Sequence, residues 1–184
     1  MKSYNFKIIN IISLFFLTSC FIGSGKNSEI IFSSNKQFPK ISGIDLNGNS
    51  HDLPEAFKGK YNLIAIGFER EHQEDINTWI KVADQIIQEK TNINFYEIPV
   101  IYKLGSFSRL WVNNGMRLGI QDKNARKRTI TVYLDREKFF ENMQMKGDRI
   151  YVLLLDNKGK ILWKTEGKAN ENSLKSLNNF IKKL

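Results

Sequence analysis

Apolar residues follow two different periods along the chain. Residues 61–68 form a nearly continuous apolar run of strand length, which predicts a strand buried on both faces of a sheet. From residue 76 to residue 87 apolar side chains recur every three or four positions, which predicts a helix covering that sheet. Residues 129–134 and 150–155 again have strand character. Strands that alternate with helices predict an α/β domain with a mixed central sheet and helices on both faces.

Turn residues divide the rest of this domain into shorter elements. Asn47-Gly48-Asn49 is a turn signal between two short strands within residues 41–53, which predicts an amino-terminal hairpin. Residues 94–102 form a further strand in which Pro99 lacks a backbone N–H. We therefore expect either an edge strand or an irregular point at Pro99. A final hairpin turns at residues 156–159, and an amphipathic helix closes the chain.

Two helices are expected in the second half of the domain. Asp135 is placed to cap one of them, and Ser106 is placed to cap a shorter one. The shorter helix carries Phe107, Leu110 and Trp111 on one face. We expect this face to pack in the core. The alternative is an exposed groove for a hydrophobic segment of a client protein.

The first twenty residues resemble a bacterial lipoprotein leader. Lys2 and Lys7 are followed by an apolar stretch at residues 8–17, which is too short to span a bilayer. The stretch ends in Leu17-Thr18-Ser19-Cys20, which is similar to a lipobox. This resemblance implies cleavage before Cys20 and acylation of its sulfur. The alternative is an ordinary secretory signal with a chance cysteine near its end.

The leader sets the expected boundaries and location. We expect a signal peptide at residues 1–19, a lipidated flexible tether at 20–37 and one folded domain at 38–184. Because two or three acyl chains hold a protein stably on a bilayer, we expect a lipid-anchored protein on the extracytoplasmic side of the bacterial cell envelope. Phe21 follows Cys20 where an Asp often signals inner-membrane retention, which favours the outer membrane in a Gram-negative cell.

Composition excludes several classes of protein. A single cysteine among 184 residues cannot form an internal disulfide, a Cys-x-x-Cys couple or a multi-cysteine zinc site. The formal net charge is +9, and loss of Lys2 and Lys7 with the leader leaves 26 basic against 19 acidic residues, or +7. This mild basic excess favours anionic partners without choosing among them. Nucleic acid is not expected, because no nucleic-acid-binding motif accompanies the charge.

The order of elements resembles the thioredoxin fold, in its peroxiredoxin-like and membrane-tethered thiol-reductase branch. In that branch a dithiol follows the first central strand, where the start of a helix favours the thiolate. The matching residues 67–75 contain no sulfur, and Ile150 stands where the branch has a cis-proline. We therefore expect neither thiol–disulfide exchange nor peroxidase activity.

A second resemblance covers residues 38–184. It rests on the order of short fragments: Phe38-Pro39, Gly43 with Leu46-Asn47-Gly48, Tyr96-Glu97-Ile98-Pro99-Val100, Met116-Arg117 with Gly119-Ile120, residues 129–135 and residues 150–163. Together these are similar to the mitochondrial ATP-synthase assembly-factor family, which acts as a chaperone for the Fo membrane sector. The resemblance implies a thioredoxin-like, non-redox protein that helps a hydrophobic subunit. That family works from the matrix side, whereas a lipobox places this domain on the outer side of a membrane.

An acidic cluster lies where the long helix is expected to begin. Glu69, His72, Glu74 and Asp75 suggest a metal-dependent or acid–base enzyme as an alternative function. The simpler interpretation is that acids at the amino terminus of a helix stabilise its dipole. Since one histidine among carboxylates has no recognisable ligand spacing, we expect no metal and no cofactor.

Basic residues are densest just before the strand at residues 129–134. The candidate binding residues are Glu97, Arg117, Lys123, Arg126, Lys127 and Arg128. The five cations suggest a rim for acidic headgroups or for an acidic protein loop, so an anionic lipid or ligand binder is another alternative. A solvated loop is the simpler interpretation of the same residues.

The leader, the expected fold and the missing sulfur together favour one function. We expect a non-enzymatic, membrane-anchored interaction or assembly module for an unidentified membrane or envelope protein. Its first partner is the bilayer, reached through acylated Cys20.

Overall fold

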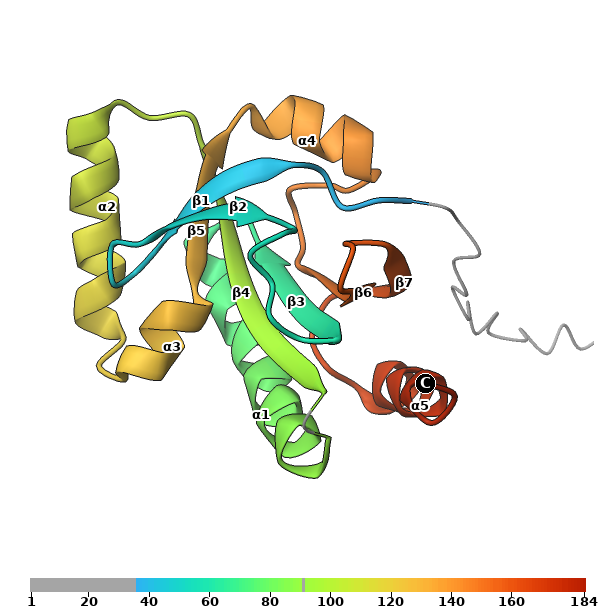
Figure 1. Cartoon of the computed structure of the whole chain (residues 1–184). Helices are drawn as coiled ribbons and strands as arrows, with labels where there is room; N and C mark the ends of the chain where they lie inside the picture. Colours follow the sequence, from blue (N-terminus) through green and yellow to red (C-terminus); the bar gives the residue numbers. More distant parts are fainter. Residues whose placement is uncertain (1–35, 91) are drawn as a thin grey trace, which may run out of the picture.

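The computed structural model describes residues 36–90 and 92–184 (Figure 1). Cys20 and the expected leader lie outside these residues. The elements are β1 (Ile41–Asp45), β2 (Ser50–Leu53), β3 (Tyr61–Gly67), η1 (Arg70–His72), α1 (Gln73–Glu89), β4 (Ile93–Tyr102), α2 (Ser106–Gly119), α3 (Lys123–Arg128), β5 (Ile130–Leu134), α4 (Arg136–Met143), β6 (Tyr151–Asp156), β7 (Ile161–Glu166) and α5 (Glu171–Ile181).

The strands form one mixed seven-stranded sheet in the order β2-β1-β5-β4-β3-β6-β7. β3 and β5 both pair with β4 in parallel, and the remaining neighbours are antiparallel. The parallel pairs are joined through helices, as parallel connections require. This arrangement confirms the predicted α/β class and the amino-terminal hairpin, which is formed by β1 and β2.

β3 is buried on both faces, as its apolar run predicts. Leu63 and Ala65 point into one core, whereas Ile64 and Ile66 point into the other. Successive side chains of a strand alternate between the two faces of a sheet, so both faces of this strand must be covered. β3 therefore lies at the centre of the molecule.

Helices cover both faces of the sheet (Figure 1). On one face α1 and α5 bury Trp79 and Leu177, and on the other face α4 buries Phe139 and Met143. Among the described residues, those buried in the two cores lie within residues 38–181. Residues 36–184 therefore carry both of these cores.

The hairpin and the start of the domain are fixed by local hydrogen bonds. Gly48 has φ +95°, a conformation that glycine adopts without strain, and its N–H donates to the Asp45 carbonyl (2.9 Å). Gln37 forms an isolated bridge with Lys160. Lys36 accepts a hydrogen bond from the Ile161 N–H (3.0 Å). The end of the expected tether thus pairs with the beginning of β7.

Pro99 does not place β4 at an edge, so that alternative of the prediction is wrong. β4 lies between β3 and β5. On the β5 side, an isolated bridge joins Glu97 to Thr129, and the regular ladder begins at Val100 opposite Val132. Pro99 lies between these two pairings, where the ladder is interrupted. The missing N–H therefore coincides with an irregular point inside a central strand.

α2 and α3 differ from their predictions. α2 runs for 14 residues, and Gly105 rather than Ser106 takes the position before its first turn without a side-chain cap. The expected basic loop is largely a helix, α3, because the Asp122 carboxylate accepts hydrogen bonds from the Asn124 and Ala125 N–H groups. None of the helices in residues 36–90 and 92–184 combines the length and hydrophobicity that crossing a bilayer requires.

Candidate functional site

The end of β3 is the place where the thioredoxin resemblance puts a dithiol. Here the chain leaves β3 at Gly67 and enters η1 through Phe68 and Glu69. The His72 Nδ1 atom accepts a hydrogen bond from the Phe68 N–H (3.1 Å) and a longer one from the Glu69 N–H (3.4 Å). His72 thereby satisfies backbone donors at the start of the helix. The histidine of the acidic cluster has a local capping role.

Glu69 pairs with a buried arginine at the beginning of α4. Its Oε1 accepts a hydrogen bond from the Arg136 Nη2 at 2.7 Å. The Arg136 side chain is 5% exposed and that of Glu69 is 52% exposed. A charge-assisted contact of this length is among the stronger hydrogen bonds in proteins. The pair joins the beginning of α4 to the end of β3.

Aromatic rings surround the Arg136 guanidinium. Its Cζ atom lies 4.2 Å from the ring centroid of Tyr102, 5.4 Å from that of Phe140 and 5.7 Å from that of Phe68. Such rings stabilise a cation that has lost part of its hydration. Nε is a buried nitrogen without a hydrogen-bond partner among the described residues. The site therefore contains a cation, a carboxylate and rings, and its described residues supply no thiol.

Arg136 was missed from the sequence, although a signal for it exists. It precedes Phe139 and Phe140 by three and four positions, so it shares the face of α4 that turns inward. Asp135 caps the helix as predicted, accepting from the Lys138 N–H (3.3 Å).

The other two members of the acidic cluster lie on the first turn of α1. Glu74 is exposed and Asp75 is partly buried. Both lie near the positive end of the helix dipole, which favours carboxylates. Within residues 36–90 and 92–184, no three His, Cys, Asp or Glu side chains are grouped so that they could hold a metal ion. The geometry gives each residue of the cluster a role in the helix start or the ion pair.

Glu97 is buried inside the sheet and does not reach the surface. It is 4% exposed, opposite Ala65 of β3. Burial raises the pKa of Glu97, while a hydrogen bond from Gln73 and the charge of Arg128 partly oppose this rise. The structure thus brings Glu97 within the electrostatic reach of one predicted binding residue, Arg128.

The basic residues divide into two groups. Arg126 donates from Nη2 to the Arg117 carbonyl (3.1 Å), and Arg128 donates to the Asp84 carboxylate (2.9 Å) and stacks on Phe95. These two arginines tie α3 to α2 and to α1. The side chains of Arg117, Lys123 and Lys127 are exposed on the surface.

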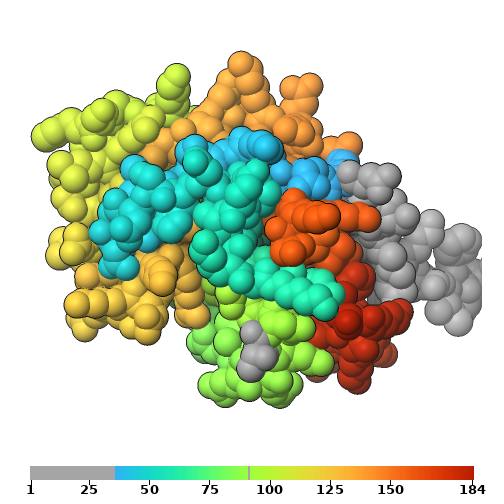
Figure 2. Space-filling view, viewed as in Figure 1, coloured from blue at the N-terminus to red at the C-terminus, as the bar shows by residue number. Residues whose placement is uncertain are grey.

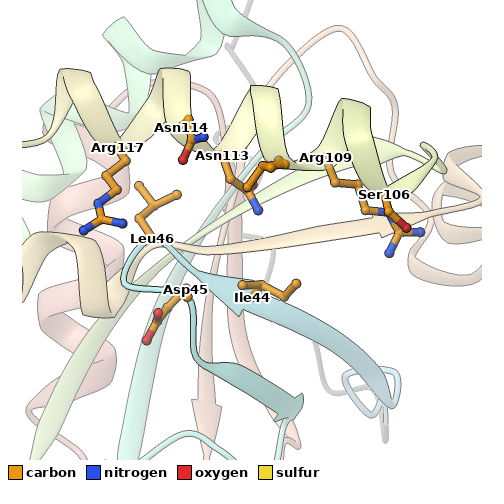
Figure 3. A pocket seen from close by; sticks show the side chains of 10 residues that line it. Ile44, Asp45, Leu46, Ser106, Arg109, Asn113, Asn114 and Arg117 are labelled. Carbon is orange, nitrogen blue, oxygen red and sulfur yellow. The ribbon is translucent and has the colours of Figure 1, made fainter.

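A groove of about 360 Å³ separates α2 from the β1–β2 turn (Figure 3). Arg109, Asn113 and Arg117 line it from α2, and Ile44 and Leu46 line it from the hairpin. In Figure 3 these α2 side chains descend from the helix toward the hairpin. The groove therefore offers amide and guanidinium donors above an apolar floor.

Asp45 also borders the groove, but its carboxylate is used within the hairpin. It accepts hydrogen bonds from Asn47, Asn49 and His51, the last at 2.9 Å. Burial alone would raise the pKa of Asp45, yet the hydrogen bonds from Asn49 and His51 outweigh it and lower the pKa below 3.8. The carboxylate is thus held charged against the turn.

Polar contacts hold α2 beside β5. The Tyr133 hydroxyl donates to Asn113 Oδ1 (2.7 Å), and the Arg109 guanidinium lies 5.0 Å from the Tyr133 ring. Burial raises the pKa of Tyr133 to about 12, although the charge of Arg109 opposes this, so the hydroxyl keeps its proton. Arg109 Nε also donates to the Leu104 carbonyl (2.7 Å). These contacts all use one side of the helix.

The apolar face of α2 does not pack in the core, so that prediction is wrong. Phe107, Leu110 and Trp111 are exposed, as is Leu118, which the sequence reading did not single out. No residue of α2 is buried. Periodicity places these residues on one face, but it does not say whether that face meets the sheet or the solvent.

Several solved structures have the same fold. The thioredoxin domain of a thiol-disulfide oxidoreductase from Bacteroides vulgatus is 20% identical with a TM-score of 0.52, and the match covers 81% of this chain and 98% of that one. A thiol:disulfide interchange protein from a Bacteroides species is 20% identical with a TM-score of 0.53, covering 82% and 91%.

A putative thiol:disulfide interchange protein from Chlorobium tepidum is 10% identical with a TM-score of 0.51, and the match covers 81% of this chain and 95% of that one. At these identities the likeness establishes the fold alone. The chain has a thioredoxin-like fold, as predicted.

Sequence comparison identifies the family. Among curated protein sequences, none matches this chain. The family model described as ATP10 protein matches residues 28–184, which include every described element. The match agrees with the resemblance seen in the short fragments between residues 38 and 163. The chain is a member of the ATP10 protein family.

Proposed function

We propose that this protein is a membrane-anchored, non-enzymatic assembly module that assists a membrane or envelope protein. Membership of the ATP10 family, an ATP-synthase assembly-factor family, supports an assembly role. The thioredoxin-like fold supplies the scaffold, because such a sheet displays side chains at its strand ends.

The residues at the end of β3 support the non-redox part of this proposal. An ion pair between Glu69 and Arg136 occupies the end of β3, and residues 67–75 contain no sulfur. Cys20 is the single cysteine of the sequence. Thiol–disulfide exchange needs a thiolate that attacks a disulfide sulfur, and no residue at this place can provide one. Contact with a client is the activity that such a surface retains.

The leader supports a lipid anchor at Cys20 on the extracytoplasmic side. Two or three acyl chains would hold the domain at a membrane, where it meets hydrophobic clients. Growth with a labelled fatty acid tests this part. Label is expected in the parent chain and not in a Cys20→Ala variant, and mass spectrometry is expected to find Cys20 at the new amino terminus. An unlabelled parent chain would remove the anchor from the proposal.

Tyr102 marks the most accessible part of the site. Its side chain closes over the Arg136 guanidinium at the end of β4, yet 52% of the residue remains exposed. A client segment that contacts this place would touch the ring and the half-exposed Glu69 carboxylate together. Strand ends and loops are common positions for binding groups.

Crosslinking in native cells tests the assembly role. A photoreactive phenylalanine analogue at Tyr102 is expected to label a membrane or envelope protein, which mass spectrometry identifies. The same analogue at the exposed Asn179 of α5 serves as the matched control. Labelling at Tyr102 alone supports the proposal. Equal labelling at the two positions, or none at either, overturns the assignment of Tyr102 to a client-binding site. Insulin reduction by residues 36–184 would overturn the non-redox part.

A further inference from the structure

The outward face of α2 carries an apolar stripe, which Asn114 and Gly115 interrupt between Trp111 and Leu118. It consists of Phe107, Leu110, Trp111 and Leu118, which follow one another at i, i+3, i+4 and i+11 and therefore share one face of the helix. Their exposed fractions are 83%, 59%, 77% and 82%. Single exposed apolar residues are ordinary, but four on one helical face mark an interaction surface.

The stripe is separate from the polar contacts that hold α2 in place, and only Leu110 of its four residues also borders the groove beside the hairpin. Asn113 and Arg109 meet Tyr133 from the opposite side of the helix. Arg126 holds the carboxyl-terminal end through the Arg117 carbonyl. Substitutions within the stripe should consequently leave the fold intact, so they can test a role in binding.

The surroundings of the stripe are strongly basic. From Lys103 to Arg128 the chain carries seven basic residues and one acidic residue, Asp122. The Asp122 carboxylate is engaged in capping α3. Lys123 and Lys127 are exposed on α3, which lies beside the end of α2 and with it forms one edge of the molecule (Figure 2). An anionic surface complements the charge of this edge.

We propose that α2 is an interfacial helix that docks the domain on an anionic membrane surface. Aromatic and leucine side chains on one face with arginine and lysine beside them are the composition of helices that lie in the plane of a bilayer. Trp111 and Leu118 would enter the boundary between headgroups and acyl chains. Lys123 and Lys127 would meet lipid phosphates, each basic residue adding attraction near the surface.

The chain between Cys20 and the folded domain is long enough for this orientation. The 16 residues from position 21 to position 36 reach at most about 55 Å when fully extended. A domain of this size is roughly 40 Å across. An anchor at Cys20 and α2 can therefore engage the same membrane, although the docking proposal does not depend on acylation.

Trp111 provides a specific optical reporter. The sequence has three tryptophans, of which Trp79 and Trp163 are buried and Trp111 is exposed. Residues 36–184, which lack Cys20, are mixed with phosphatidylcholine vesicles that contain one-third phosphatidylglycerol. The Trp111 emission is expected to shift to shorter wavelength and to be quenched by brominated acyl chains. Vesicles of phosphatidylcholine alone should produce neither change at low protein concentration.

Matched variants separate the apolar and electrostatic contributions. Leu118→Gln should lower the partition coefficient by about tenfold, because one leucine no longer enters the membrane. Leu184→Gln, at an exposed leucine outside α2, should leave it unchanged. Lys123→Gln with Lys127→Gln should weaken binding and flatten its salt dependence.

The charge control is Lys175→Gln with Lys182→Gln, which removes two exposed lysines at α5 and should not change binding. Circular dichroism confirms that each variant is folded. Absence of a Trp111 shift on anionic vesicles, or equal losses in the test and control variants, would overturn the proposal. So would a dimer that depends on Leu118 and ignores vesicles, since a second copy would then cover the stripe. The crosslinking at Tyr102 can fail or succeed independently of these outcomes.

Discussion

Removing the Glu69 carboxylate should destabilise the domain more than removing the Arg136 cation. The reason is the unequal exposure of the two side chains, 52% for Glu69 and 5% for Arg136. When Arg136 is replaced by methionine, water hydrates the remaining carboxylate. When Glu69 is replaced by alanine, the guanidinium stays buried without its counter-charge, and buried charges are costly when unpaired.

The expected magnitudes follow from this geometry. Breaking a fully buried pair costs about 3–5 kcal/mol, whereas exposed pairs contribute about 0–1 kcal/mol. Glu69→Ala lies between these limits, and the rings of Tyr102, Phe68 and Phe140 still stabilise the cation. We expect a loss of about 2 kcal/mol in the free energy of unfolding.

The complementary variant has a smaller effect. Arg136→Met loses these ring contacts but replaces them with contacts between sulfur and aromatic rings. We expect a loss of about 1 kcal/mol. The double variant should lose less than the sum of the two single variants, because the carboxylate has no buried cation to neutralise once Arg136 is absent.

Urea unfolding of residues 36–184 measures these values. The buried Trp79 and Trp163 report the transition by fluorescence. Lys138→Met, which removes the exposed Asp135–Lys138 pair on the same helix, is the control and should change stability by less than about 0.5 kcal/mol. If the losses of the two single variants add in the double variant, the ion pair contributes no coupling and the reasoning is refuted.

Three further predictions concern titrating groups. Since the pKa of Asp45 lies below 3.8 in the folded protein, its contribution is present above that pH and disappears as pH falls through the folded pKa. In urea titrations, Asp45→Asn should be less stable than the parent at pH 7 by about 1 kcal/mol, with a gap that narrows in acid. The pKa of Glu97 lies above its ordinary value of 4.5. The free energy of unfolding of the parent should therefore fall as pH rises from 4.5 through the raised pKa of Glu97, and Glu97→Gln should abolish the part of this fall that is due to Glu97. Burial, assisted by the charge of Lys36, lowers the pKa of Lys164 to about 8. Mass spectrometry should therefore find that the acetylation rate of Lys164 levels off above about pH 8, whereas that of the exposed Lys175 keeps rising at higher pH, and parallel pH profiles would contradict this.

The central sheet could be predicted because its strands carry continuous apolar runs. The run at residues 61–68 has no polar face except at Asn62, whose amide bonds with the Gly59 backbone in a buried turn. Such a strand fits only between two covered faces. The hairpin could also be predicted from the sequence, because its turn requires a positive φ and Gly48 provides it.

The fate of α2 could not be predicted from its pattern. Helical spacing identifies Phe107, Leu110 and Trp111 as neighbours, but it contains no information about what covers them. Val112 and Met116 provide apolar surface on the other side of the helix, and they are partly buried. Both sides of α2 are therefore suited to packing, and the competition between them is decided by tertiary structure.

Most of the candidate site could not be predicted from the sequence, for a related reason. His72 and Glu69 are close in sequence, so their shared role at the helix start was foreseeable. Arg136, by contrast, is 67 residues from Glu69, and only the parallel pairing of β4 with β3 and β5 brings the strand ends together. Electrostatic contacts across such distances depend on topology, which a local pattern does not specify.

The two charged regions of the molecule have opposite solvent exposure, and this difference separates their roles. Arg136 is enclosed by aromatic rings and the Glu69 carboxylate. Its charge therefore interacts with groups of the domain itself and chiefly fixes the ends of the strands. Lys123 and Lys127 remain in water beside an apolar stripe that is also in water. Exposed lysines contribute little to folding stability, and exposed apolar side chains contribute less than buried ones. The lysines and the apolar stripe of the α2–α3 edge can thus still interact with a partner. An anionic bilayer would contact both, the lysines through its phosphates and the stripe through its acyl chains.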